Sequence, residues 1–132
     1  MMIYDINGAS FSDVTGHNAP TTSPNKTEGL SVDQVVAALI GYGVPAAKLQ
    51  IGVPFYGRGF GGVKETDPTK VIGSDFGGLT SQGTFENSVY SGFDLNVNYI
   101  GKNGWESYFD SDYKANYLFN QQRKELISYE TP

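Results

Sequence analysis

Tyr56 and Arg58 are the first residues whose types and position together suggest chemistry. They follow the segment Leu49–Phe55, whose alternating apolar side chains predict a buried strand. Pro54 lacks a backbone donor, so strand pairing is expected to stop there. In α/β folds, ligands bind just beyond the carboxyl ends of buried strands, which makes this phenol and guanidinium candidates for ligand contacts. A packed tyrosine and a structural ion pair are the competing interpretation, and the two residues alone leave both open.

Tyr4 and Asp5 stand in a similar position near the amino terminus. The apolar run Met1–Ile6 predicts a short buried strand that ends at Asp5 and the following Asn7-Gly8. A phenol and a carboxylate at a strand end could serve a reaction, but they could equally close a turn with Gly8.

The elements that would position these groups form a strand, a long loop, a helix and a second strand. The polar stretch Ala9–Leu30 exceeds ordinary connections, which is typical of a functional loop. Ser31 and Gln34 have the spacing of a capping box that would start a helix. Apolar residues then recur at helical spacing, and glycines end the pattern: Val32, Val35, Val36, Leu39, Ile40, Gly41 and Gly43. Such a unit pairs its strands in parallel, and two strands with one helix cannot cover both faces of a parallel sheet. Residues 1–60 therefore predict a piece of a larger α/β fold.

The second half of the chain has a different pattern. Residues 61–83 are rich in Gly, Thr, Ser and Asp, and short strands are predicted later. The expected strands are Thr84–Tyr90, Trp105–Asp110, Asn116–Asn120 and Glu125–Tyr129, with a turn at Gln121–Lys124. Phe93–Ile100 fits either a strand or a helix. Trp105 is expected to pack in the core of this α+β module, because it alternates with Ser107 and Phe109.

Composition excludes several classes of function. The net charge of −5 and the absence of a basic run argue against nucleic acid and anionic membranes as partners. The chain has no cysteine and one histidine, His17, so neither a zinc–thiolate nor a multi-histidine site is expected. No cofactor or metal is predicted. No apolar run approaches the roughly 20 residues of a membrane span.

Several short motifs, in order along nearly the whole chain, resemble family 18 glycoside hydrolases, the chitinases. Met2-Ile3-Tyr4-Asp5 resembles the M-x-Y-D motif of the sixth barrel strand in that family. Further stretches resemble the following loop, the seventh strand and the chitinase insertion domain: Thr15–Pro20, Gly43–Leu49, Gly52–Arg58, Gly83–Asn87, Tyr117–Phe119 and Leu126–Tyr129.

The resemblance implies a fold that is α/β plus α+β. Residues 1–60 would be a partial (β/α)8 TIM barrel containing the sixth and seventh strands, and residues 61–132 the insertion domain. The D-x-x-D-x-D-x-E motif, which carries the proton donor in the family, has no match among the acidic residues. The resemblance therefore implies a fragment that is inactive alone.

The resemblance also implies roles for seven residues. Chitinases of this family use the substrate's N-acetyl group as the nucleophile. Tyr4 would donate its hydroxyl to the acetamido carbonyl, and Asp5 would place negative charge near the developing oxazolinium ion. Substrate contacts would come from Met2 in the pocket floor, Phe11 by stacking, Tyr56 and Arg58 at the glycone side, and Glu86 from the insertion domain. His17 and Asn18 are expected to organise the long loop.

The sequence leaves three functions open. The first is a chitinase fragment acting on chitin or chito-oligosaccharides, from a parent that the family resemblance implies is secreted. A non-catalytic, lectin-like chitin-binding protein on the same scaffold is the second, and an α+β interaction module unrelated to sugar is the third. Because residues 1–6 and 49–55 would lack their barrel neighbours, we expect self-association or pairing with the missing barrel half.

Overall fold

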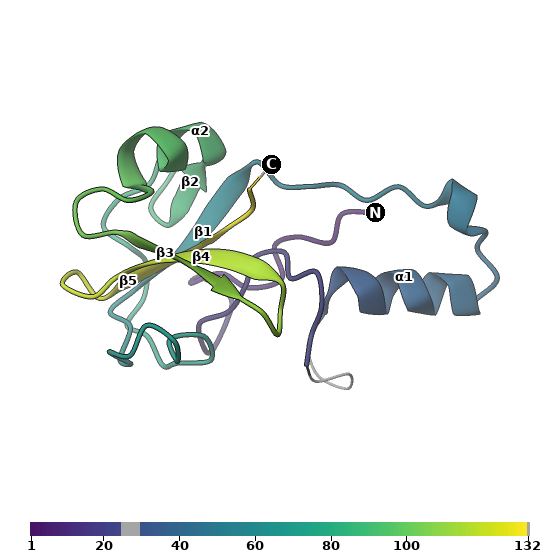
Figure 1. The fold of residues 1–132 in the computed structure, drawn as a ribbon, viewed down its shortest axis with the longest axis horizontal. Coiled ribbons are helices and arrows are strands. Elements are labelled where there is room, and N and C mark those ends of the chain that lie inside the picture. Colours follow the sequence, from purple (N-terminus) through teal and green to yellow (C-terminus); the bar gives the residue numbers. More distant parts are fainter. Residues whose placement is uncertain (25–29, 132) are drawn as a thin grey trace.

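The computed structural model describes residues 1–24 and 30–131, so residues 25–29 of the long polar stretch and Pro132 lie outside the described part. Figure 1 shows a lobe built on a β-sheet and a second part, containing a helix, that extends away from it. The sheet has five strands in the order β2-β1-β5-β4-β3, and every neighbouring pair is antiparallel. Along the described ranges, no helix is long and apolar enough to cross a membrane.

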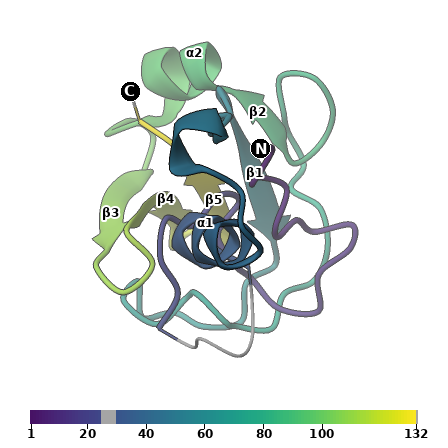
Figure 2. The same ribbon diagram turned by 90° about the vertical axis from the view of Figure 1, so that its right-hand side faces the viewer.

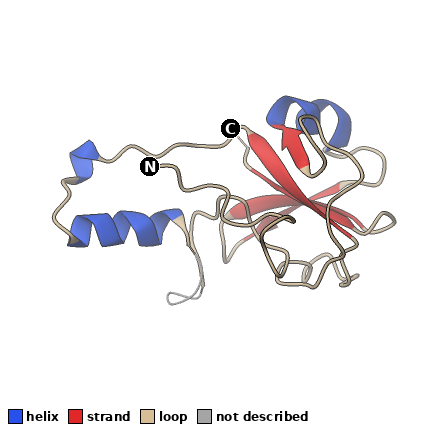
Figure 3. Ribbon diagram, turned by 180° about the vertical axis from the view of Figure 1, so that it is seen from behind, coloured by secondary structure: helices blue, strands red, loops and turns tan. Residues whose placement is uncertain are grey.

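The strands confirm most of the pattern predicted for the second half. They are β1 (Tyr56–Gly61), β2 (Val89–Ser91), β3 (Glu106–Asp110), β4 (Ala115–Asn120) and β5 (Glu125–Tyr129). The ambiguous segment is helical: α2 (Gly92–Asp94) continues into the π-helical turn η2 (Leu95–Tyr99), and both lie beside β2 at one side of the sheet (Figure 3).

Two apolar clusters cover the two faces of the central strands. Successive residues of β4 and β5 point to opposite faces, so Phe119 and Leu126 enter one cluster while Leu118 and Ile127 enter the other. Burial on both faces explains why the sequence of these strands is apolar without a clean alternation. Trp105 is buried in the second cluster, as predicted, although Phe109 of β3 is exposed.

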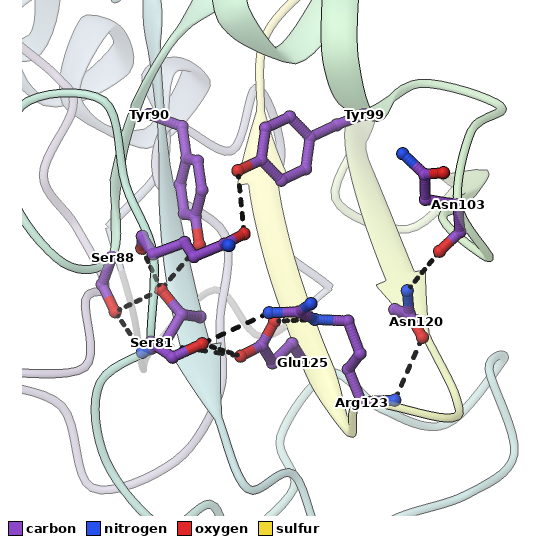
Figure 4. Close-up of polar contacts among 10 residues, drawn as sticks. Ser81, Ser88, Tyr90, Tyr99, Asn103, Asn120, Arg123 and Glu125 are labelled. Atoms are coloured by element: carbon purple, nitrogen blue, oxygen red, sulfur yellow. Dashed lines mark hydrogen bonds and ion pairs between the residues drawn. The ribbon is translucent and has the colours of Figure 1, made fainter.

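Side-chain hydrogen bonds hold the turn between β4 and β5 in place. Lys124 adopts the left-handed conformation with φ 54°, and Asn120 Oδ1 accepts a hydrogen bond from the amide of Arg123. Figure 4 shows the Arg123 side chain between Glu125 and Ser81, with Nε 2.8 Å from Glu125 Oε2 and Nη2 3.2 Å from Ser81 Oγ. The predicted turn at 121–124 therefore also holds a neighbouring loop against the sheet.

The helix in the first half is confirmed, but its predicted cap is not. Helix α1 (Val32–Gly41) is followed by the 3-10 turn η1 (Ala46–Lys48). The Ser31 hydroxyl makes no capping hydrogen bond to the helix and donates instead to Asp33 Oδ1 at 2.5 Å. No residue of α1 is buried, and viewed end-on the helix stands in front of the sheet (Figure 2).

The two strands predicted in the first half are corrected by the structure. Residues 1–6 and 49–55 are extended, but they form only one parallel bridge, between Met2 and Gly52. Gly52 N donates to Met1 O at 2.8 Å. A parallel pair needs further strands and covered faces, and the described residues place no further strand beside these two segments. Regular strand structure begins later, at Tyr56, where β2 supplies an antiparallel partner, and β5 pairs with β1 from Arg58 onward.

One strand of the sheet crosses the predicted boundary at residue 60. Strand β1 crosses that boundary, so residues assigned to the two segments share one sheet. The barrel detail and the division into residues 1–60 and 61–132 remain predictions.

Candidate functional site

The carboxylate of Asp5 is the centre of the candidate site. Asp5 Oδ1 accepts a hydrogen bond from the Tyr56 hydroxyl and another from Arg58 Nε, each at 2.6 Å. Asp5 comes from the amino-terminal segment, and its two partners come from β1. The structure therefore brings Asp5 together with two predicted site residues that lie 51 and 53 positions away in the sequence.

Aromatic rings lie beside this group. The Tyr4 ring meets the Tyr56 ring edge to face, with centroids 6.2 Å apart. The Arg58 guanidinium carbon lies 5.3 Å from the centroid of Phe11 and 5.8 Å from that of Tyr56, within cation–π range. Together, Tyr4, Asp5, Phe11, Tyr56 and Arg58 form what we call the Asp5 cluster.

Gly8 permits the close approach of Phe11 to Arg58. A Cβ atom at Gly8 would lie 2.7 Å from the Phe11 ring and 2.9 Å from Arg58 Cδ, which is closer than non-bonded carbons approach. The glycine after the Tyr-Asp pair therefore shapes this part of the cluster.

The electrostatics keep Asp5 ionised and Tyr56 protonated. Burial raises the pKa of Asp5, but the hydrogen bonds from Arg58 and Tyr56 and the Arg58 charge outweigh it, so the pKa lies below its ordinary value. Burial and the bond to Asp5 raise the pKa of Tyr56. The hydrogen bond to Asp5 raises the pKa of Arg58, with smaller contributions from other groups that include the Glu86 charge. The cluster therefore presents a fixed negative charge that a cation and a phenol hold in place.

Glu86 approaches the cluster from a turn of the second half. Its side chain is exposed, and its backbone carbonyl accepts from Val89 N at 3.0 Å. Thr84 N and Phe85 N both donate to Val89 O, which closes the turn against the start of β2. Glu86 is thus linked to the cluster by its charge, and no direct hydrogen bond joins it to Asp5 or Arg58 in the described residues.

Met2 lies apart from the Asp5 cluster. It forms the parallel bridge with Gly52 and is 79% exposed, so in this chain it does not line an enclosed pocket. The adjacent Tyr4 ring packs close to Gly52, where an added Cβ would lie 3.2 Å from Tyr4 Cε1. The described residues contain no group of three or more His, Asp or Glu side chains placed to hold a metal ion.

One residue has a larger part in the site than the sequence suggested. Asn18, expected only to organise the loop, contacts the backbone of both Asp5 and Tyr56. Sequence pattern gives no signal of this contact, because the atoms that Asn18 contacts belong to the backbone and lie 13 and 38 residues away.

Comparison with known proteins gives consistent results. The family model described as glycosyl hydrolases family 18 matches residues 1–132. Chitinase A1 of Niallia circulans is 38% identical over 98% of this chain, and Chitinase 1 of Aphanocladium album is 35% identical over all of it. The chain spans 19% and 29%, respectively, of the lengths of these relatives.

Solved structures agree with the family model. Chitinase ChiW from Paenibacillus sp. strain FPU-7 matches with a TM-score of 0.83 at 35% identity, over 98% of this chain and 14% of that one. Chitinase ChiA74 from Bacillus thuringiensis matches with a TM-score of 0.82 at 28% identity, over 98% of this chain and 23% of that one. A family model that covers every residue, with these relatives beside it, establishes that the chain belongs to family 18 of the glycosyl hydrolases.

Proposed function

We propose that this chain is part of a chitinase that hydrolyses β-1,4-linked N-acetylglucosamine polymers with retention of configuration. Family membership and the names of the relatives support the substrate class. The observation that carries the proposal is the Asp5 carboxylate, held at 2.6 Å by both Tyr56 and Arg58 beside the Tyr4 ring.

The proposed chemistry uses the acetamido group of the substrate as the nucleophile. Its carbonyl oxygen attacks the anomeric carbon and forms an oxazolinium ion, while the leaving sugar oxygen takes a proton from an acid outside these 132 residues. Tyr4 donates a hydrogen bond that holds the acetamido group, and Asp5 stabilises the positive charge as it develops. Water then attacks the anomeric carbon, whose bond to the acetamido oxygen breaks, and gives a proton to the conjugate base of that acid; the N-acetyl group and the acid are both regenerated.

The remaining predicted residues bind the sugar chain in this proposal. Tyr56 and Arg58 keep Asp5 in place and offer polar atoms to the glycone side. Phe11 presents an exposed ring for stacking, and Glu86 accepts a hydrogen bond from a sugar hydroxyl. Met2 forms part of the pocket floor once the neighbouring strands of the barrel are present.

Hydrolysis of a fluorogenic chitobioside tests the proposal. The 132-residue chain alone should give no turnover, and mixing it with a polypeptide that supplies the other barrel strands and the acid should restore activity. In the restored enzyme, Tyr4→Phe or Asp5→Asn should lower kcat about 10²- to 10³-fold, because each removes electrostatic stabilisation of the transition state.

Matched controls alter exposed residues outside the Asp5 cluster. Tyr42→Phe alters an 86% exposed tyrosine after α1, and Asp13→Asn alters an exposed aspartate of the loop; both should keep activity. Turnover by the chain alone would overturn the requirement for an external acid. Sugar binding without turnover in the restored complex would favour the lectin-like alternative.

A further inference from the structure

Asn18 is a completely buried amide placed between the two segments that form the Asp5 cluster. Its Oδ1 accepts a hydrogen bond from Asp5 N at 3.0 Å, and its Nδ2 donates to Tyr56 O at 3.3 Å. Its backbone carbonyl accepts from Ile6 N at 3.0 Å. One side chain therefore contacts the backbone of both residues whose own side chains meet at 2.6 Å.

We propose that Asn18 is a positioning residue that holds Asp5 and Tyr56 in the relative orientation the candidate site requires. The catalytic consequence rests on the proposed function, whereas the positioning itself is a property of this chain.

The backbone of Asp5 shows why such a residue is needed. Asp5 has φ 58°, in the left-handed region that residues other than glycine occupy at an energetic cost. This conformation persists where surrounding contacts impose it, and hydrogen bonds from Asp5 N and Ile6 N to Asn18 lie on both sides of that φ/ψ pair. The direction of the Asp5 side chain depends on this backbone, so the position of its carboxylate depends on Asn18.

Asn18 is itself fixed to the sheet. Its backbone amide donates to Ser128 Oγ of β5 at 2.9 Å, and Ser128 is the register partner of Arg58 on β1. The preceding residue, His17, pairs through Nε2 with Asp110 Oδ2 of β3 at 3.0 Å. Asn18 therefore aligns Asp5 against β5, the strand that pairs with β1, on which Tyr56 and Arg58 lie.

A buried asparagine could also serve global stability alone, and amide hydrogen exchange separates the two roles. Asp5 lies outside every strand, so its amide is protected in the wild-type chain only if the bond to Asn18 persists. Asn18→Ala should speed exchange at Asp5 about tenfold relative to the core strands, because the amide loses its acceptor. Asn18→Asp keeps an acceptor at that place and should keep the Asp5 amide protected.

The pKa of the Asp5 carboxyl group provides a second measurement. In Asn18→Ala the carboxylate should separate from Arg58 and Tyr56, and its NMR-measured pKa should rise towards the ordinary value. Asn7→Ala is the matched control, because Asn7 Nδ2 donates to His17 O at 3.0 Å in the same loop without contacting Asp5 or Tyr56. Asn7→Ala should leave both the exchange and the titration of Asp5 unchanged.

Protection of the Asp5 amide, in the wild-type chain and in the substituted chains, decides whether the proposal stands. The proposal is overturned if the Asp5 amide is unprotected in the wild-type chain, or if Asn18→Ala and Asn7→Ala affect Asp5 equally. If Asn18→Ala does not fold, Asn18→Asp decides: protection at Asp5 supports the proposal, and its loss contradicts it. None of these measurements involves a sugar, so failure of the proposed function would leave their interpretation intact.

Discussion

Asp5 is stabilised as an anion by two different kinds of donor. The phenol of Tyr56 is a neutral donor, and the Arg58 guanidinium is a charged donor to the same oxygen. Both bonds are charge-assisted because the acceptor is ionised, but Arg58 adds an opposite charge, so it is expected to contribute more to the ionised state than Tyr56.

Replacing Arg58 tests that contribution. In Arg58→Met, which keeps an aliphatic stem beside Phe11, the pKa of Asp5 should rise towards its ordinary value because the charged donor is gone. The free energy of unfolding near neutral pH should fall by about 1 kcal/mol, since the pair is partly exposed. NMR titration of the Asp5 carboxyl group and urea unfolding measure the two effects.

The pH dependence of this variant has a defined sign. A carboxyl group whose folded pKa is lowered stabilises the fold above its unfolded pKa, and the stabilisation is lost as pH falls through the folded value. Loss of stability below about pH 4 should therefore be shallower in Arg58→Met than in the wild-type chain. Arg123→Met, which removes the positive charge paired with Glu125, is the control and should not move the Asp5 titration. An unchanged Asp5 pKa in Arg58→Met would contradict the assignment.

Glu130 should affect the pH dependence of stability in the opposite direction to Asp5, because its pKa is raised. Its Oε1 is buried without a hydrogen-bond partner in the described residues, and burial raises its pKa from 4.5 to about 7. Stability should therefore decline as pH rises through that interval, because the folded state must release a proton that it binds more tightly than the unfolded state does. Glu130→Gln should remove the decline, as measured by thermal unfolding between about pH 4 and 8. A wild-type melting temperature that stays constant over this range would refute the expectation.

Among the elements, those complete within this chain followed the sequence pattern most closely. β5 occupies the predicted range Glu125–Tyr129, and α1 begins directly after Ser31 as its apolar spacing indicated. Both depend on local pattern together with partners that the chain contains. Segments 1–6 and 49–55 did not become strands, because an apolar parallel pair needs further strands and covered faces.

The candidate site shows the same division between local pattern and long-range contact. Motif resemblance identified Tyr4, Asp5, Tyr56 and Arg58, and the structure brings these residues together. The motif resemblance could not identify the backbone contacts of Asn18, since nothing in the pattern of the sequence specifies φ at Asp5.

The turn that carries Glu86 depends on Gly83. A Cβ at this position would lie 1.8 Å from Glu86 O, and this neighbour is backbone that cannot rotate away. Gly83→Ala should therefore displace the turn, lower the free energy of unfolding by about 1–3 kcal/mol, and shift the amide resonances of residues 84–89. Gly41→Ala at the end of α1, where an added Cβ meets no atom within 4 Å, should be neutral or slightly stabilising. Equal effects of the two substitutions would show that the turn is not tightly constrained.

At the scale of the whole molecule, the sheet lobe has its own core, and the α1 segment does not. The buried residues of the two apolar clusters all lie between Phe60 and Tyr129, whereas α1 contributes no buried residue. The extended segment after η1 exposes apolar side chains, including Val53 at 57% and Phe55 at 77%. Exposed apolar surface beside unpaired strand edges favours association with another chain.

We therefore expect the isolated chain to self-associate through this segment. Sedimentation velocity over a range of concentrations should show species larger than a monomer, and Val53→Thr with Phe55→Ser should shift the population towards monomer, because apolar contact area is lost. Phe109→Ser, which removes a 63% exposed phenylalanine from β3, is the matched control and should leave association unchanged. Under the proposed barrel architecture, adding a polypeptide that supplies the other strands should weaken this association, since both would cover the same surface. A strictly monomeric chain at every concentration would show instead that these edges are protected without a partner.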